Sequence, residues 1–429
     1  MSVPRVWVTG LGLVTALGRD LECNWTGALA GRSAIRALTG AEWGGAPVKA
    51  AGVVDDADLA VIDDTFPAEA AAGVDRRTRF ALWAARAALA DAGLAAPGGS
   101  RAGTALGAGL GVVRLEDVAR FLGPDGRFDA RRFAAGGEAV RPDSQIRCPP
   151  DLATASIARH FGLGGPSLTV TTACASATQA IGTAFRLIRR GEADWAVCGG
   201  ADSMLHPVGL VYFVLLRAAS QSADPPETVC RPFDRRRSGL VMGEGAGMVV
   251  LESEPHARAR GGGRPWAELA GYGTSMDAYE PTAPHPQGEG AVRAMAAALA
   301  DAGLGPGDID YINAHGTGTK LNDPVETLAI RTAFGAAADG LCVTSSKPFF
   351  GHLLAACGGA ECVLTALTVA RSVVPPTPNL TTPDAKCDLD YVPGRPRERT
   401  VRAALSNSFG FGGQNGCLVL RRVDGATGR

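Results

Sequence analysis

One short segment occurs twice in the chain, and this repeat limits the possible folds more than any other feature. The heptapeptide ALADAGL stands at 88–94 and again at 298–304. In both places it ends an Ala-rich helical pattern with a glycine, the residue that commonly terminates helices. A strand-like segment follows each copy after a loop, RAGTALGAGLG at 101–111 and IDYINAHGTGT at 309–319. The sequence therefore predicts two related halves.

Two further pairs of segments recur in the same order. GPSLTVTTACASATQAIGTAFRLIRRG (165–191) and GLCVTSSKPFFGHLLAACGGAECVLTALTVARS (340–372) both predict a strand, a short turn and a helix of small residues. Gly-rich turns before apolar strands end both halves, at 243–253 and 410–422. Alternating strands and helices predict βαβ units with mainly parallel sheets, covered on both faces. Two such halves would form a layered α/β structure with a shared central layer.

The boundary between the halves is placed in the polar, Gly-rich stretch 252–264, which gives an N-terminal half 1–257 and a C-terminal half 258–429. Residues 113–150 fit neither half and are interpreted as an inserted surface or interface segment.

Composition excludes several classes of protein. The 429 residues carry a net charge of -1, so no overall basic field favours nucleic acid or an anionic membrane. The N-terminal MSVPRVWVTGLGLVTALG has neither a charged leader region nor a long apolar block, and it predicts a first strand with a Gly-rich turn. We expect a cytoplasmic protein. The ten cysteines lack a disulfide-scaffold spacing and contain no CxxC pair for zinc, so each is first interpreted as core, Cys357 and Cys362 included.

Cys174 departs from that core interpretation. It stands between the strand-like SLTVTT and the helix-like ASATQAIGTAFRLIRR, among small neighbours that leave room for a substrate. The unpaired N–H groups and the dipole of a helix N-terminus favour an anion. On this argument the thiol has a lowered pKa and is a candidate nucleophile.

Two of the six histidines lie beside glycines at strand ends in the second half. His315 belongs to NAHGTGT, and His352 belongs to GHLLAACGG with Lys347 five residues before it. Functional groups collect at the carboxyl ends of strands in α/β folds, so both histidines are candidate site residues. The Gly-rich loop SFGFGGQNG (408–416) lacks a dinucleotide-binding pattern and could bring backbone N–H groups to an oxyanion.

Together these motifs resemble the elongating β-ketoacyl-acyl carrier protein synthases. The resemblance rests on TACASA, NAHGTGT, KPFFGH and FGFGGQN, and it extends from VTGLGLVTALG to NGCLVL. It implies an α/β fold of the thiolase-like type, a duplicated αβαβα arrangement in five layers. It also implies a decarboxylating Claisen condensation, in which an acyl chain held on the enzyme reacts with malonyl-acyl carrier protein to give a β-ketoacyl product.

The resemblance implies a role for each matching residue. Cys174 would carry the acyl chain as a thioester, and His315 and His352 would stabilise the enolate formed on decarboxylation. Lys347 would orient His352 and tune its electrostatics. The backbone N–H groups of Cys174 and Phe411 would form the oxyanion hole, and the Phe411 ring would gate the acyl pocket. The remaining positions would be Thr317, Thr319 and Phe409 for substrate and phosphopantetheine, Glu326 as a structural acid, and Arg76, Arg77 and Arg217 for carrier-protein docking.

Such an enzyme would need no metal and no cofactor of its own, because phosphopantetheine is carried by the partner. The implied partners are acyl carrier protein, malonyl and acyl thioesters, and a second subunit, with neither nucleic acid nor a membrane. That subunit would be a second copy in a homodimer or, in a heterodimer, a chain-length factor.

Enzyme classes related to these synthases can be distinguished from them by single residues. Thiolases use a second cysteine in a late Gly-rich motif, but Cys417 begins an apolar strand here and is interpreted as core. Initiating synthases use Cys, His and Asn, whereas His352 favours a Cys-His-His set. Chain-length factors lack the nucleophile that Cys174 supplies.

Some positions leave the pathway open. Ser238, Leu240, Lys320 and Gln414 depart from the usual fatty-acid residues, and Lys320 resembles type II polyketide ketosynthase subunits. The catalytic subunit of a polyketide heterodimer is therefore an alternative to a fatty-acid elongase. A third alternative, of a different class, is a non-catalytic scaffold partner of a condensing enzyme.

Overall fold

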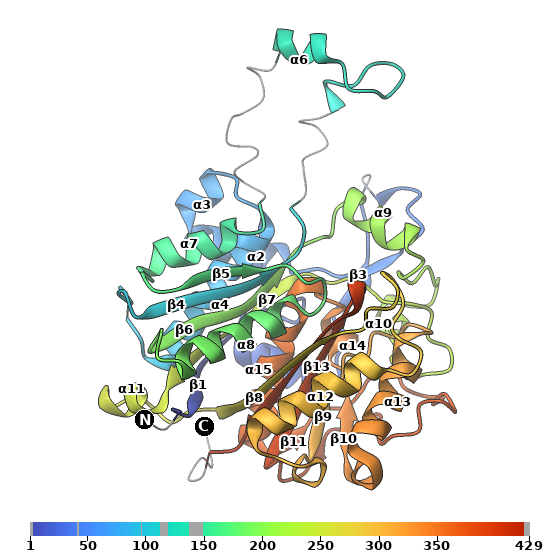
Figure 1. Cartoon of the computed structure of the whole chain (residues 1–429). Coiled ribbons are helices and arrows are strands. Elements are labelled where there is room, and N and C mark those ends of the chain that lie inside the picture. The colour runs from blue at the N-terminus through green and yellow to red at the C-terminus, as the bar shows by residue number, and fades with distance from the viewer. Residues whose placement is uncertain (1–2, 41–42, 96, 112–118, 137–148, 424–429) are drawn as a thin grey trace.

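A computed structural model of the chain describes residues 3–40, 43–95, 97–111, 119–136 and 149–423. Figure 1 shows a layered α/β structure whose two halves face each other across a pair of central helices. The α/β fold class is confirmed.

The main sheet shows the duplication directly. Its order is β10-β9-β13-β14-β8-β1-β7-β6-β4-β5, so reading outward from the central β8 and β1 gives the same arrangement in both halves. The first half supplies β1 (Val6–Val14), β4 (Ala102–Ala108), β5 (Ser167–Val170), β6 (Trp195–Asp202) and β7 (Gly245–Ser253). The second supplies β8 (Ala267–Met276), β9 (Tyr311–Asn313), β10 (Cys342–Thr344), β13 (Ala403–Gly410) and β14 (Gln414–Arg421).

Strand direction corrects the expectation of mainly parallel sheets. In the first half β4 pairs in parallel with β5 and β6, but β7 is antiparallel to both β6 and β1. The second half repeats this pattern, with β9 parallel to β10 and β13, and β14 antiparallel to β13 and β8. A tight turn, η6 (Phe411–Gly413), reverses the chain between β13 and β14, and such a short connection permits only an antiparallel pair.

Helices form the other layers. α8 (Ser176–Arg189) and α15 (Cys357–Arg371) lie between the two halves of the sheet, and almost every residue of α15 is buried. The stretch Leu354–Arg371 is long and apolar enough to cross a membrane, but 89% of it is buried inside the structure, as expected of a core helix. α4 (Arg76–Ala92) covers β1 and α12 (Glu289–Ala302) covers β8; both end at the predicted glycines, Gly93 and Gly303.

Shorter elements complete the structure. The other helices are α1 (Leu21–Leu29), α2 (Asp56–Thr65), α3 (Pro67–Ala71), α6 (Ala130–Gly136), α7 (Leu152–Phe161), α9 (Pro207–Leu215), α10 (Pro226–Val229), α11 (Glu254–Ala259), α13 (Asn322–Phe334) and α14 (Lys347–Phe350). Two small antiparallel sheets pair β2 (Ile35–Ala37) with β3 (Ala50–Gly52), and β11 (Val373–Val374) with β12 (Arg397–Glu398). Besides η6, the described part of the chain contains the 3-10 turns η3 (Pro306–Asp308), η4 (Gly335–Gly340) and η5 (Leu354–Ala356).

The predicted insertion and boundary can be located on this framework. Within 113–150 the structure describes 119–136 and 149–150, and α6 with its neighbouring turn projects away from the layers (Figure 1). Residues 113–118 and 137–148 lie outside the described part. The boundary between 257 and 258 falls within α11, the helix between the last strand of one half and the first of the other, and it stays a prediction.

Candidate active site

Cys174 lies in the turn that connects β5 to α8. Ala173 has a φ of 50°, an uncommon value for a residue with a side chain, and Ala175 is the N-cap of α8. This turn points the thiol toward the second half of the molecule, where it is 6% exposed. The predicted position at a helix N-terminus is confirmed.

The predicted lowering of the Cys174 pKa is wrong in direction. Burial raises the pKa of the thiol to about 11, although the Lys347 charge and a hydrogen bond from the Phe411 backbone N–H both act to lower it. Removing a thiolate from water therefore outweighs these two stabilising groups. A nucleophile in this state must give up its proton to a base as it attacks.

His315 follows β9 and is fixed through its backbone by an acid. Glu326 of α13 accepts the N–H groups of His315 and Gly316, each at 2.8 Å. Both the histidine and the acid are buried, and burial raises the pKa of Glu326 to about 7. Burial and the Lys347 charge hold the pKa of His315 well below its usual value, so the ring is neutral.

Lys347 contacts His315 rather than His352. Its ammonium donates to the His315 carbonyl and to Glu361, whose Oε1 lies 2.6 Å away. Both side chains have no exposed surface, and the Glu361 carboxylate raises the pKa of Lys347 despite burial. In the described part of the chain, no hydrogen bond between the Lys347 and His352 side chains supports the implied orientation. The implied electrostatic effect agrees with the structure, because burial and the Lys347 charge both lower the pKa of the His352 ring.

His352 lies between α14 and η5, directly after a turn residue, Gly351, whose backbone conformation favours glycine. Gly351 has a φ of 80°, and a Cβ on it would come within 2.6 Å of the Met242 carbonyl oxygen. The His352 N–H donates to the Val241 carbonyl at 2.7 Å, which fixes the residue beside the first half. The backbone N–H of Leu354 donates to Nδ1 of the ring at 3.0 Å. The ring hydrogen is therefore on Nε2.

The three predicted side chains converge. One ligand atom from each of Cys174, His315 and His352 lies within 4.8 Å of the others, and the two imidazole rings are perpendicular with centroids 5.4 Å apart. A thiol with two imidazoles is also a donor set for a soft divalent cation. The buried Lys347 charge disfavours a cation here, whereas it favours an enolate or oxyanion. The group can therefore accept a thiol proton and stabilise developing negative charge.

The Gly-rich loop between β13 and β14 passes directly over the nucleophile. A Cβ on Gly410 would lie 3.1 Å from the Cys174 nitrogen, so only a glycine allows this approach without displacement. The Phe411 backbone N–H faces the Cys174 sulfur and acts to lower the pKa of the thiol. The Phe409 ring packs edge-on against His315, with centroids 6.0 Å apart. This arrangement can bind the oxygen of a tetrahedral intermediate.

A cavity of about 200 Å³ connects this centre to the surface. Thr317 and Thr319 line it, with their hydroxyl oxygens 3.0 Å apart, and Arg217 and Lys320 lie exposed at its mouth. A narrow passage with hydroxyls along it and cations outside suits a linear, polar substrate arm.

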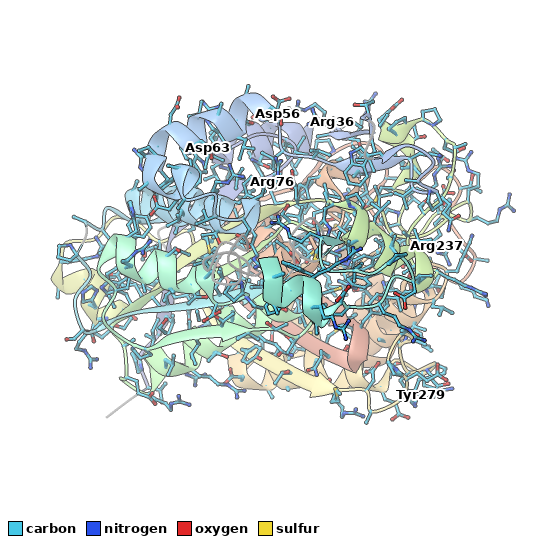
Figure 2. The ribbon with its side chains drawn as sticks, turned by 90° about the horizontal axis from the view of Figure 1, so that it is seen from above. Arg36, Asp56, Asp63, Arg76, Arg237 and Tyr279 are labelled. Atoms are coloured by element: carbon cyan, nitrogen blue, oxygen red, sulfur yellow. The ribbon has the colours of Figure 1, made fainter. Side chains whose placement is uncertain are left out.

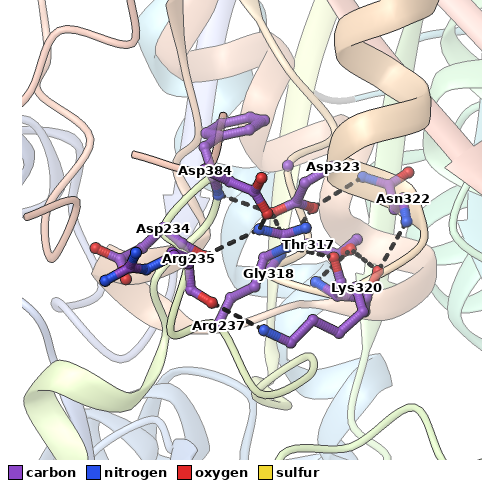
Figure 3. A network of polar contacts seen from close by, with 12 residues as sticks. Asp234, Arg235, Arg237, Thr317, Gly318, Lys320, Asn322, Asp323 and Asp384 are labelled. Carbon is purple, nitrogen blue, oxygen red and sulfur yellow. Dashed lines mark hydrogen bonds and ion pairs between the residues drawn. The ribbon is translucent and has the colours of Figure 1, made fainter. Parts of the chain in front are cut away.

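A buried arginine fixes the loop that carries the two threonines (Figure 3). Arg237 is 2% exposed and donates to the Thr319 carbonyl at 2.8 Å. Its Nη1 donates both to an Asp384 carboxylate oxygen at 2.7 Å and to the backbone carbonyl of Asp234 at 3.0 Å. Lys320 adds a second connection, to the carbonyl of Arg235 at 2.9 Å.

Two residues expected to dock a carrier protein have internal partners. Arg77 is 4% exposed and donates to the carbonyls of Gly109 and Leu110. Arg76 forms a paired contact with the buried Glu244, at 3.0 and 2.5 Å. Burial argues against a docking role for Arg77, whose carbonyl partners no spacing in the sequence revealed. Arg76, which Figure 2 labels, keeps 30% of its side chain exposed beside Glu244, so its docking role stays a prediction.

Three of the four sequence departures, Ser238, Leu240 and Lys320, line the same cavity. Ser238 lines it and hydrogen-bonds Ser220 at 2.6 Å. Leu240 is buried in an apolar cluster against which Phe411 packs. Cys417 is fully buried with its thiol on Asn407, which agrees with its interpretation as core.

Sequence reasoning missed two residues at this site, Glu361 and Arg237. It also missed the contact that the Cys357 sulfur makes with the His352 ring. No motif pointed to Glu361, although a carboxylate inside the apolar pattern GGAECVL was a signal for a buried pair.

Taken together, the duplicated layers, the cysteine at the central helix and the two facing histidines define a thiolase-like condensing enzyme. Two protein-family models match the chain. The model described as "Beta-ketoacyl synthase, N-terminal domain" matches residues 4–257, and the one described as "Beta-ketoacyl synthase, C-terminal domain" matches residues 266–381. The chain belongs to the β-ketoacyl synthase family and is an acyltransferase of the condensing type.

Individual relatives agree over their full lengths. The chain is 40% identical to 3-oxoacyl-[acyl-carrier-protein] synthase 2 of Staphylococcus aureus strain N315, covering 98% of this chain and 99% of that protein. The structure also resembles a chain from a solved complex of a type II polyketide acyl-carrier protein with its ketosynthase. The TM-score is 0.86 and the identity 30%, covering 99% of this chain and 100% of that chain. The ishigamide ketosynthase/chain length factor has a TM-score of 0.84 and 34% identity, covering 98% and 100%.

Proposed function

We propose that the protein condenses an acyl chain held on Cys174 with a malonyl thioester on an acyl carrier protein, during fatty-acid or polyketide elongation. The observation that carries this proposal is the convergence of Cys174, His315 and His352 within 4.8 Å at the inner end of the cavity.

In the first half-reaction the Cys174 sulfur attacks the acyl thioester carbonyl. The thiol proton passes to a neighbouring neutral imidazole, and the N–H groups of Cys174 and Phe411 bind the oxyanion. Collapse of the intermediate releases the pantetheine thiol and leaves the acyl chain on Cys174.

In the second half-reaction His315 and His352 donate to the thioester oxygen of the malonyl group. Loss of CO2 leaves an enolate, whose charge these donors and the nearby Lys347 stabilise without any strong base. The enolate carbon attacks the Cys174 thioester, forms the new carbon–carbon bond and expels the Cys174 thiolate. Every step uses side chains and backbone of this chain, so the enzyme needs no cofactor of its own.

The carrier protein would dock over the cavity mouth and extend its phosphopantetheine arm past Thr317 and Thr319. Carrier proteins are acidic, and the exposed cations at the mouth, Arg217 and Lys320, give the complementary charge. We assign docking to these two residues in place of the buried Arg77, within a cytoplasmic enzyme.

A second subunit is supported by the segment around α6. Phe128 and Phe133 there are 58% and 47% exposed, and large exposed aromatics on a projecting segment suit a protein contact. The Lys320 departure and the likeness to ketosynthases solved with a chain-length factor favour a heterodimer as the second candidate assembly, beside a homodimer.

The test is product formation by the purified chain. Acyl- and malonyl-carrier proteins are supplied with the chain alone and with a candidate chain-length factor, and the carrier-bound product is identified by mass. A β-ketoacyl carrier protein made by the chain alone supports a homodimeric elongase. Product only with the second subunit supports the heterodimer, and no product in either case contradicts the proposed reaction.

A further inference from the structure

A second thiol lies inside the candidate active site. Cys357 begins α15, has no exposed surface, and its sulfur lies 3.0 Å from Nδ1 of His352. Nδ1 already accepts the backbone N–H of Leu354 at 3.0 Å. A nitrogen that accepts one hydrogen bond through its lone pair carries no hydrogen, so the Cys357 sulfur can only be the donor in this contact.

The charge states of both groups agree with that direction. Burial raises the pKa of Cys357 well above its ordinary value, so the group stays a thiol with a hydrogen to donate. Burial and the Lys347 charge keep the pKa of His352 well below its ordinary value, so the ring stays neutral.

We propose that Cys357 is a positioning residue whose S–H bond to Nδ1 holds the His352 ring with its Nε2–H available to the substrate. The inference rests on the role proposed above for His352. A ring that turned over would present an unprotonated nitrogen to the thioester oxygen and would lose its donor for the enolate. With two donors on Nδ1, the productive orientation is favoured before substrate arrives.

The inference predicts an effect on one half-reaction. Acyl transfer to Cys174 depends on the backbone donors of Cys174 and Phe411 and on proton transfer to His315. The proton does not go to His352, because Nε2 of that ring already carries a hydrogen and its Nδ1 accepts the Leu354 N–H. Decarboxylation depends on the Nε2–H of His352. Loss of the thiol should therefore slow the second reaction and spare the first, which a general packing defect would not do.

The chain provides a matched control on the same helix. Cys362 is also fully buried, and it packs in the same apolar cluster as Cys357. Cys362→Ala removes the same atom from α15 without touching His352. Cys357→Ser keeps a donor, and Cys357→Val fills the space without one.

The experiment measures two rates in the full-length chain, together with its second subunit if one is needed. Acyl transfer is followed by intact mass with acyl-carrier protein, and CO2 release is followed with malonyl-carrier protein. Cys357→Ala and Cys357→Val should slow CO2 release roughly three- to tenfold, the effect of losing one hydrogen bond, with acyl transfer unchanged. Cys357→Ser should recover most of the rate, and Cys362→Ala should match wild type.

Equal rates of CO2 release in wild type and both donor-free variants would overturn the inference, as would equal losses in both half-reactions. Should Cys357→Ala not fold, the volume-preserving Cys357→Val gives the same comparison. A wild-type protein that releases no CO2 contradicts the proposed function instead, so the two failures are distinguishable.

Discussion

At the scale of single residues, the ammonium of Lys347 and the carboxylate of Glu361 depend on each other. They lie 2.6 Å apart with no exposed surface, so neither charge has access to water. Removing one partner leaves the other buried and uncompensated. The pair also fixes His315 through its carbonyl, which joins stability to the geometry of the site.

Lys347→Met should therefore lower the free energy of unfolding by about 3–5 kcal/mol, measured by urea denaturation. The double variant Lys347→Met/Glu361→Leu should regain most of that stability while CO2 release stays low, because the His315 carbonyl still lacks its donor. If Lys347→Met were as stable as wild type, the Glu361 carboxylate would not be left as an uncompensated buried charge, which would contradict this prediction.

Glu326 should give the protein a specific pH dependence. Its pKa is raised from 4.5 to about 7 by burial, so between these values the folded state binds more protons than the unfolded state. Stability from this group therefore falls as pH rises through that window, by up to about 3 kcal/mol.

Glu326→Gln has no such titration, so the difference in unfolding free energy between variant and wild type should change with pH across this window and level off outside it. Denaturation at several pH values measures this difference. Parallel curves for the two proteins would contradict the assignment.

The candidate catalytic residues could be predicted because their local patterns are distinctive, but their surroundings could not. Cys174, His315 and His352 each stand beside small residues at a strand end. The carbonyl that Lys347 binds and the Glu244 that occupies Arg76 depend on contacts between distant segments, which no local pattern contains. The predicted direction of the Cys174 pKa shift was wrong for the same reason, since burial is a property of the folded molecule.

At the scale of elements, the turn before His352 requires a glycine. The Cβ introduced by Gly351→Ala would lie 2.6 Å from the Met242 carbonyl oxygen. This contact should strain the turn by about 1–3 kcal/mol. Because the turn carries His352, CO2 release should fall more than thermal stability suggests.

Gly261 provides the control for this prediction. It also has a positive φ, 64°, but a Cβ there would meet nothing within 4 Å. Gly261→Ala should cost about 1 kcal/mol of stability and leave CO2 release unchanged. The comparison fails if both variants lose activity equally.

The repeat predicted the elements well because duplicated sequence conserves the order of strands and helices. ALADAGL does end α4 and α12, and the order of strands is the same in both halves. The antiparallel β7 and β14 escaped prediction because an apolar strand pattern carries no direction. Only the length of each connection does, and the short turn at Phe411–Gly413 was interpreted for its chemistry instead.

At the scale of the whole molecule, recognition of the carrier protein should depend on charge at the cavity mouth. Arg217→Glu combined with Lys320→Glu should raise KM for malonyl-carrier protein roughly tenfold, with a weaker salt dependence. A small malonyl thioester lacking the carrier should show no change, because it has no acidic surface.

Arg258→Glu on α11 is a charge reversal at an exposed site away from the cavity mouth, and it is compared with Arg217→Glu alone so that each variant reverses one charge. It should leave KM for the carrier substrate unchanged. Equal effects of the two changes would show that net charge, rather than the mouth, controls docking.

The central claim is that Cys174 carries the acyl chain between the two half-reactions. The most direct measurement is the intact mass of the protein after exposure to acyl-carrier proteins, with wild type beside Cys174→Ala, followed by addition of malonyl-carrier protein. The account predicts one acyl adduct per chain in wild type, none in Cys174→Ala, and loss of the adduct with CO2 release on adding malonyl-carrier protein. An adduct that persists in Cys174→Ala, or that malonyl-carrier protein does not remove, would contradict it.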